Sequence, residues 1–331
     1  MSVSIRPVET SDLNIVVDLL MLDAEQRYAK DQTLWKLEAN AREKVASTIK
    51  TAMANENPPF RQRWLVAETC GDIVGITHTI LLPVPPIYAG ELGAPGLIME
   101  DCFVSEGAPA DTSKFLLAAA EADLVEAGAK NLLASSTVGG AWEAEYAAQN
   151  YAPLTLYLAK VGLNPAPKSE GVRNATEDDV PAIVASSSDN RQILFDLDEF
   201  WKPHPEADVR FGSWMARSLT LTDRDMFVSE AEGDFEGYVI SQPATPLHFP
   251  TPHDVGEIGV IDDYYHTDFE NPTVLAHRGR AASDLLQAAE AALDARGNTA
   301  ALIVCPAAWA SKISVLKDNG YDTAIVWFIK R

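Results

Sequence analysis

The chain has 331 residues, which is long for a single hydrophobic core and favours two domains. Its 47% hydrophobic and 22% charged residues are typical of a globular protein. The net charge of −22 argues against nucleic acid and anionic membrane surfaces as partners, because long-range repulsion opposes the encounter.

Targeting and metal signals are missing from the sequence. There is no run of about 18 uncharged apolar residues, so we expect no membrane partner. The first residues form no apolar secretion segment, which predicts a cytoplasmic protein. The three cysteines and six histidines show no metal-type spacing, so no metal is expected.

In chain order, the first half reads as a β-α-α-β-β-β-α-β-α-β unit. A tight Gly71-Asp72 turn joins two strands into a hairpin, and acidic cap residues precede the first helix. The expected strands are 5–7, 64–69, 74–80, 97–104, 131–135 and 154–159, and the expected helices are 13–20, 35–53, 114–127 and 141–149.

The second half repeats this order. Asp284–Leu293 matches Phe115–Leu124 at seven of ten positions, and Val228–Gly237 matches Val66–Gly75 at five of ten. Ile261–Tyr265 aligns with Glu100–Val104. The sequence therefore predicts an α/β (α+β) protein of two tandem domains, 1–163 and 172–331, joined by a linker over 164–171. Each domain is expected to be a mixed, mostly antiparallel twisted sheet flanked by helices.

This repeated unit resembles the GNAT superfamily of acetyl-CoA-dependent N-acetyltransferases, in a tandem form similar in architecture to mycothiol synthase. The family holds the CoA pyrophosphate on an Arg/Gln-x-x-Gly-x-Gly/Ala turn that opens the central helix. Small residues there let backbone N–H groups approach the phosphates. The matching positions of the second half are small or basic: Arg278, Gly279, Arg280, Ala281, Ala282 and Ser283.

In the first half the same turn positions are Pro109, Thr112 and Lys114. Proline removes a donor and lysine is bulky, so the resemblance implies a degenerate first half and an acetyl-CoA site in the second. The end of the central strand, Tyr264-Tyr265, is then expected to pair with the pantetheine arm or to pack as an ordinary strand.

The resemblance also implies a general base and an acid. Glu257 and Asp263 are candidate bases that share a strand face with Tyr265 if side chains alternate, with Asp262 opposite. Glu100 is the candidate in the first half. The family's thiolate-protonating tyrosine corresponds to Leu316 in the second half and to Tyr146 in the first.

The aromatic segment 200–214 follows the first helical region of the second half, where the family places the acceptor. Trp201, His204 and Trp214 are candidate substrate contacts. The predicted function is acetyl transfer from acetyl-CoA to a primary amine of a small molecule or peptide. The alternatives are a degenerate protein that binds a ligand or partner without catalysis, and chemistry in the first half through Glu100 and Tyr146. A monomer, as an internal pseudo-dimer, and a homodimer are both compatible with the repeat.

Overall fold

The structure is a computed structural model that describes residues 2–55, 58, 60–163, 169–245 and 248–331. Residues 164–168 of the predicted linker lie outside the described residues. The predicted order of elements is confirmed in both halves. The one strand expected over 97–104 is divided into two short strands.

The bounds of the elements are as follows. The first half contains β1 (Ser4–Pro7), α1 (Leu13–Lys30), α2 (Ala41–Ala54), β2 (Arg61–Thr69), β3 (Asp72–Leu81), β4 (Pro95–Ile98), β5 (Phe103–Val104), α3 (Thr112–Glu126), β6 (Asn131–Thr137), α4 (Trp142–Ala148) and β7 (Ala152–Val161). The second contains β8 (Val172–Asn174), α5 (Val180–Leu197), α6 (Ala207–Ser218), β9 (Asp225–Ala231), β10 (Asp234–Pro243), β11 (Ile258–His266), α7 (Arg280–Ala295), β12 (Ala300–Pro306), α8 (Ala310–Asp318) and β13 (Asp322–Lys330).

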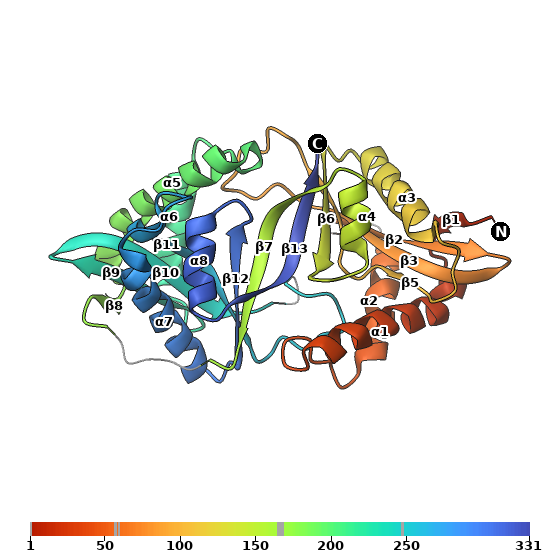
Figure 1. Cartoon of the computed structure of the whole chain (residues 1–331), viewed down its shortest axis with the longest axis horizontal. Helices are drawn as coiled ribbons and strands as arrows, with labels where there is room; N and C mark the ends of the chain where they lie inside the picture. Colours follow the sequence, from red (N-terminus) through yellow and green to blue (C-terminus); the bar gives the residue numbers. More distant parts are fainter. Residues whose placement is uncertain (1, 56–57, 59, 164–168, 246–247) are drawn as a thin grey trace.

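The two halves share one mixed sheet and exchange their last strands. The order is β1-β2-β3-β4-β6-β13-β7-β12-β11-β10-β9-β8. β13 pairs with β6 of the first half, and β7 pairs with β12 of the second. β7 and β13 run antiparallel to each other through the middle of the molecule, with one half on either side (Figure 1). Each half therefore needs the other to complete its sheet.

The two halves begin with the same partly buried ion pair. Arg6 Nη1 lies 2.6 Å from Asp12 Oδ2, and Arg173 Nη2 lies 2.6 Å from Asp179 Oδ1. Asp12 also accepts the Glu9 backbone N–H, and so caps the turn that leads into α1. The shared Arg…Asp pattern in the sequence thus fixes how each first strand enters its first helix.

The central strand of each half separates from its neighbour part-way along. β4 pairs with β6 only over 95–98, after which β5 pairs with β3 alone. β11 pairs with β12 over 258–261 and then continues with β10 to His266. Both separations form a wedge in the sheet, with the exposed edge of a strand on one side.

The pairing corrects the predicted alignment of the two central strands. Val104 lies opposite Gly75 of its hairpin, and His266 lies opposite the equivalent Gly237. Val104 therefore corresponds to His266, one residue further than the alignment of Val104 with Tyr265. A β-bulge at Asp262, which lies between the pairs Ile240–Asp263 and Ser241–Ile261, accounts for part of the irregularity that the sequence pattern does not reveal.

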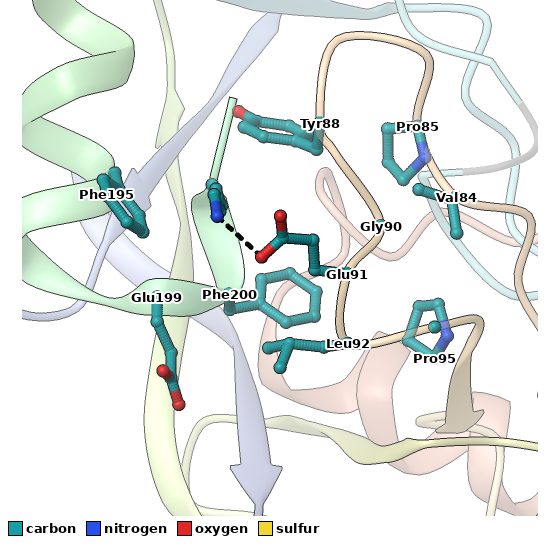
Figure 2. A pocket seen from close by; sticks show the side chains of 12 residues that line it. Val84, Pro85, Tyr88, Gly90, Glu91, Leu92, Pro95, Phe195, Glu199 and Phe200 are labelled. Carbon is teal, nitrogen blue, oxygen red and sulfur yellow. Dashed lines mark hydrogen bonds and ion pairs between the residues drawn. The ribbon is translucent and has the colours of Figure 1, made fainter. Parts of the chain in front are cut away.

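Each half sends a loop across to the other. The segment between β3 and β4 reaches the second half, where Tyr88 forms a β-bridge with Pro203. The segment between β10 and β11 reaches the first half, where His253 bridges Leu37. A pocket of 160 Å³ lies at the first crossing, and Figure 2 shows residues that line it. Lys202 Nζ donates to Glu91 Oε2 at 2.7 Å in this pocket. This pocket belongs to neither wedge.

Candidate active site

The wedge of the first half opens into a cavity of 580 Å³, which we call the N-wedge cavity. Its walls come from β5, the end of β6, the first turns of α3 and α4, and the end of α1. Small residues line much of it, which leaves room for a chain to lie against the free strand edges. They are Ala108, Ala110, Ser113, Ser136, Gly139, Gly140 and Ala141.

A second cavity of 390 Å³ lies beside it, and we call it the aromatic cavity. It is lined mainly by apolar side chains of the first half, by Tyr157 and Trp327 of the exchanged strands, and by residues 248–251 of the crossing loop. Glu100 lines both cavities. This carboxyl group therefore stands where the two spaces meet, in the gap between β4 and β5.

The electrostatics around Glu100 suit a proton acceptor. Burial raises the pKa of Glu100 above its usual range, and the neighbouring Asp101 charge raises it further. Asp101 is also buried, which by itself raises its pKa, but the hydrogen-bonded His78 brings the pKa of Asp101 below its usual range. The two adjacent carboxyl groups thus differ in basicity because only one of them has a hydrogen-bonded imidazole.

His78 and Asp101 form a buried dyad that the sequence analysis missed. His78 Nδ1 lies 2.9 Å from Asp101 Oδ1, and the imidazole stacks on Trp64 with ring centroids 4.1 Å apart. A carboxylate only accepts hydrogen bonds, so Nδ1 donates to Asp101. Nε2 is buried and has no hydrogen-bond partner among the described residues. The 23-residue separation of the pair gave no sequence signal.

A buried arginine lines the N-wedge cavity. Arg27 donates from Nη1 to Asp23 at 2.5 Å and to the Glu100 carbonyl at 3.2 Å, and from Nε to His253 of the crossing loop at 3.0 Å. Its Nη2 is buried without a hydrogen-bond partner in the described part of the chain. Arg27 is a lining residue with this unsatisfied buried donor, and such a donor is stabilised if a carbonyl oxygen of a bound molecule comes within reach.

One lysine side chain lies in the wedge of the second half, at the wall of a cavity that the wedge retains. Lys312 of α8 is 4% exposed, and its Nζ donates to the Tyr264 carbonyl at 2.6 Å. The ammonium also lies over the rings of Tyr264, Phe269 and Trp309, at 5.1 to 5.5 Å from their centroids. Burial lowers the pKa of Lys312. Lys312 thus already donates a hydrogen bond to the Tyr264 carbonyl, which is a strand-edge acceptor for a ligand in this wedge.

The predicted phosphate turn, residues 277–283, begins α7. His277, Arg278 and Gly279 all have positive φ angles, of 47°, 58° and 62°. A buried carboxylate already lies against this helix end: Asp268 Oδ2 accepts the Ala282 backbone N–H at 3.2 Å. An acidic group in that place competes with a phosphate for the helix N–H groups.

The groove over this turn measures 860 Å³ and carries mixed charge. Glu236, Asp268, Asp284 and Asp318 line it together with His277, Arg278 and Arg280. The groove shares no lining residue with the acceptor-side cavity of the second half, among the residues that the structure describes. In this half the predicted cofactor and acceptor spaces are therefore separate. Tyr264 and Tyr265 are buried in the core, in agreement with ordinary strand packing.

The acceptor-side cavity of the second half, 230 Å³ in volume, brings together Trp201, Trp214 and Asp263. His204 is not among its lining residues, because its Nδ1 accepts the Glu206 backbone N–H at 3.0 Å. The predicted sharing of a face by Glu257 and Asp263 is wrong: Glu257 precedes β11 and pairs with Lys36 at 2.9 Å.

The β-bulge in β11 also corrects the predicted orientation of Asp262. Asp262 lines the same cavity as Asp263, although simple alternation placed it on the opposite face. Burial raises the pKa of Asp263 to about 6, while the Tyr238 hydroxyl donates to it at 2.8 Å.

Tyr146 lies in the hydrophobic core of the first half. It is 0% exposed, packs against Trp142, Tyr151 and Phe328, and lines neither described cavity. Burial raises its pKa well above the usual range for tyrosine. This position gives no support to Tyr146 as the proton donor to a thiolate.

Replacing Asp263 by asparagine is expected to stabilise the protein at neutral pH. The folded-state pKa is about 6 against an ordinary value of 3.8, so folding favours the protonated acid. Stability is therefore lost as pH rises from about 4 to about 6, by on the order of 2–3 kcal/mol. The amide keeps the shape and removes the charge. Urea unfolding at pH 4 and pH 8 measures the effect; a variant less stable than the parent at pH 8 would contradict it.

The described residues include neither a membrane-spanning helix nor a cluster of metal ligands. No helix among them is long and apolar enough to cross a membrane. No group of three or more His, Cys, Asp or Glu side chains among them is placed to hold a metal ion.

Comparison with solved structures identifies the fold. A GCN5-related N-acetyltransferase from Sphaerobacter thermophilus aligns with a TM-score of 0.56 and 12% identity, over 99% of this chain and 95% of that one. The glucosamine N-acetyltransferase region of a fungal multi-domain GH3 β-N-acetylglucosaminidase aligns with a TM-score of 0.53 and 14% identity, over 99% of this chain and 38% of that one. No protein-family model and no curated protein matches the sequence. The chain has the fold of the GNAT N-acetyltransferases, and the likeness spans both halves.

Proposed function

We propose that this protein is an N-acetyltransferase whose active site lies in the first half. The observation that carries the proposal is the position of Glu100, which lines both the N-wedge cavity and the aromatic cavity. A carboxyl group at the meeting of two spaces can accept a proton from a molecule in one while that molecule reacts with a molecule in the other.

The N-wedge cavity has features that fit an acyl-CoA. Free strand edges at the wedge offer hydrogen bonds to an extended amide chain, and small residues surround the start of α3, where a helix N-terminus favours phosphate. Bound acetyl-CoA supplies an activated acyl group as a thioester. This assignment reverses the sequence-based preference for the second half, whose wedge holds Lys312.

Each residue of the site has a separate role in the reaction. Glu100 takes a proton from the acceptor ammonium, which frees the nitrogen lone pair for attack on the thioester carbon. Arg27 Nη2 donates to the carbonyl oxygen as negative charge develops there. The carbon–sulfur bond then breaks, the thiolate leaves with the electron pair, and the second amine proton neutralises it. His78 and Asp101 hold the wall of the acceptor space beside Glu100.

A non-catalytic ligand-binding role is the second candidate. The described charged residues of the N-wedge cavity include four acids, Asp23, Glu100, Glu106 and Glu145, against two bases, Arg27 and Lys30. That balance weakens attraction for the phosphates of CoA. Incubation with acetyl-CoA and a panel of primary amines, followed by mass spectrometry, separates the two roles. Acetylated amine supports the transferase; acetyl-CoA left intact with every amine supports the binding role.

A further inference from the structure

The aromatic cavity has a composition that selects among amines. Aromatic side chains enclose it from the first half, the exchanged strands and the crossing loop. The aromatic lining residues are Phe60, Trp64, Tyr157, Phe249 and Trp327, joined by aliphatic residues such as Ile49 and Leu97. Such walls favour a ligand with an apolar, flat body, because burial of that body removes apolar surface from water.

The cavity contains two carboxyl groups, and of the two histidines that also line it, His78 is bonded to one of them. Glu100 and Asp101 line it, and no lysine or arginine is among the lining residues that the structure describes. A carboxylate or phosphate on the acceptor would be buried there beside two carboxyl groups and without a lysine or arginine partner, at a high desolvation cost. An acceptor with many hydroxyl groups would leave most of them without partners against these walls. A single ammonium group beside Glu100 meets neither obstacle.

The second half closes this cavity. Phe249 is 3% exposed and packs edge-on against Trp35 of the first half, with ring centroids 4.9 Å apart. The loop is fixed just after Phe249 by two backbone hydrogen bonds to the first half: Glu38 N donates to Pro252 O at 3.0 Å, and Asp254 N donates to Lys36 O at 2.7 Å. A wall of the acceptor space in one half is thus built by the other half.

We propose that the acceptor is a primary amine on an apolar, preferably aromatic, body without an acidic group, and that Phe249 of the second half is a specificity-determining residue for it. The proposal rests on the proposed transferase function of the first half. It also gives the tandem arrangement a purpose, because the first half has no complete acceptor space without the crossing loop.

The test compares four acceptors: phenethylamine, hexylamine, glucosamine and phenylalanine. We expect kcat/KM for phenethylamine to exceed that for phenylalanine and for glucosamine by at least about 100-fold, with hexylamine in between. Phenylalanine differs from phenethylamine only by its carboxylate, so this pair isolates the charge argument. Preference for phenylalanine or glucosamine would overturn the proposal.

A binding measurement separates failure of the acceptor class from failure of the transferase function. Phenethylamine is titrated into the protein without acetyl-CoA, with tryptophan fluorescence as the readout, since Trp64 lines the cavity. Phenethylamine binding without acetylation of any amine would reject the transferase and keep the ligand class. Absence of phenethylamine binding to folded protein would overturn the ligand class.

The role of Phe249 is tested by Phe249→Ala, with Phe249→Leu as a variant that keeps apolar volume. Both are expected to raise KM for phenethylamine, by about 10-fold or more for alanine, with kcat little changed. The matched control is Phe200→Ala, in the pocket of Figure 2, which should leave KM unchanged. Thermal melting verifies folding. Equal KM values for the folded leucine and alanine variants and the parent would remove Phe249 from the acceptor site.

Discussion

Replacing Glu100 by glutamine is expected to lower acetyl transfer by about 10²- to 10⁴-fold while acetyl-CoA affinity stays unchanged. The amide has nearly the same shape as the acid but cannot take a proton from an ammonium group. Glu100 lines both cavities, and no other described residue does. No second described carboxylate is therefore placed to take over its role. Steady-state rates with a reactive amine and titration calorimetry with acetyl-CoA measure the two quantities.

The pH dependence provides a second readout of the same residue. Burial raises the pKa of Glu100 above the ordinary 4.5, and the base works only when it is deprotonated. Activity of the parent should therefore fall as pH drops through that raised pKa, and the glutamine variant should lack this acid limb. Asp262→Asn, at the wedge of the second half, is the matched control and should keep both rate and profile. An unchanged profile in Glu100→Gln would remove Glu100 from the mechanism.

The fold was largely predictable because its signals are local. The hairpin turns, the acidic caps and the shared helix pattern of 115–124 and 284–293 each depend on a few neighbouring residues. A duplicated order of such elements defines the architecture of each half. The strand exchange was not predictable, since β7 and β13 have the same apolar pattern whichever sheet they join.

The site was harder to predict because it depends on contacts between distant segments. Lys312 has no distinctive sequence signal, yet it lies in the wedge of the half that carries the better phosphate turn and binds a strand carbonyl there. Asp268, 14 residues before Ala282, occupies the helix end that the turn pattern assigned to phosphate. Glu100 was a candidate, but its position between two cavities depends on a strand break that no periodicity shows.

Placing a carboxylate at the start of α3 is expected to weaken acetyl-CoA binding by at least about 10-fold. Ser113 is the second residue of α3 and lines the N-wedge cavity. Glutamate in a first helical turn complements the helix dipole, so Ser113→Glu should fold normally. The same charge repels the phosphates that the proposed site holds there. Affinity for acetyl-CoA measures the loss, and circular dichroism checks the fold.

The second half offers a matched variant, and with it the most direct test of where the site lies. Ala281 is the second residue of α7 and lines the groove over the predicted phosphate turn. Titration calorimetry with acetyl-CoA compares the parent, Ser113→Glu and Ala281→Glu. The first-half site predicts one binding event per chain, weakened in Ser113→Glu and unchanged in Ala281→Glu. Loss of binding in Ala281→Glu alone, or no binding by the folded parent, would contradict it.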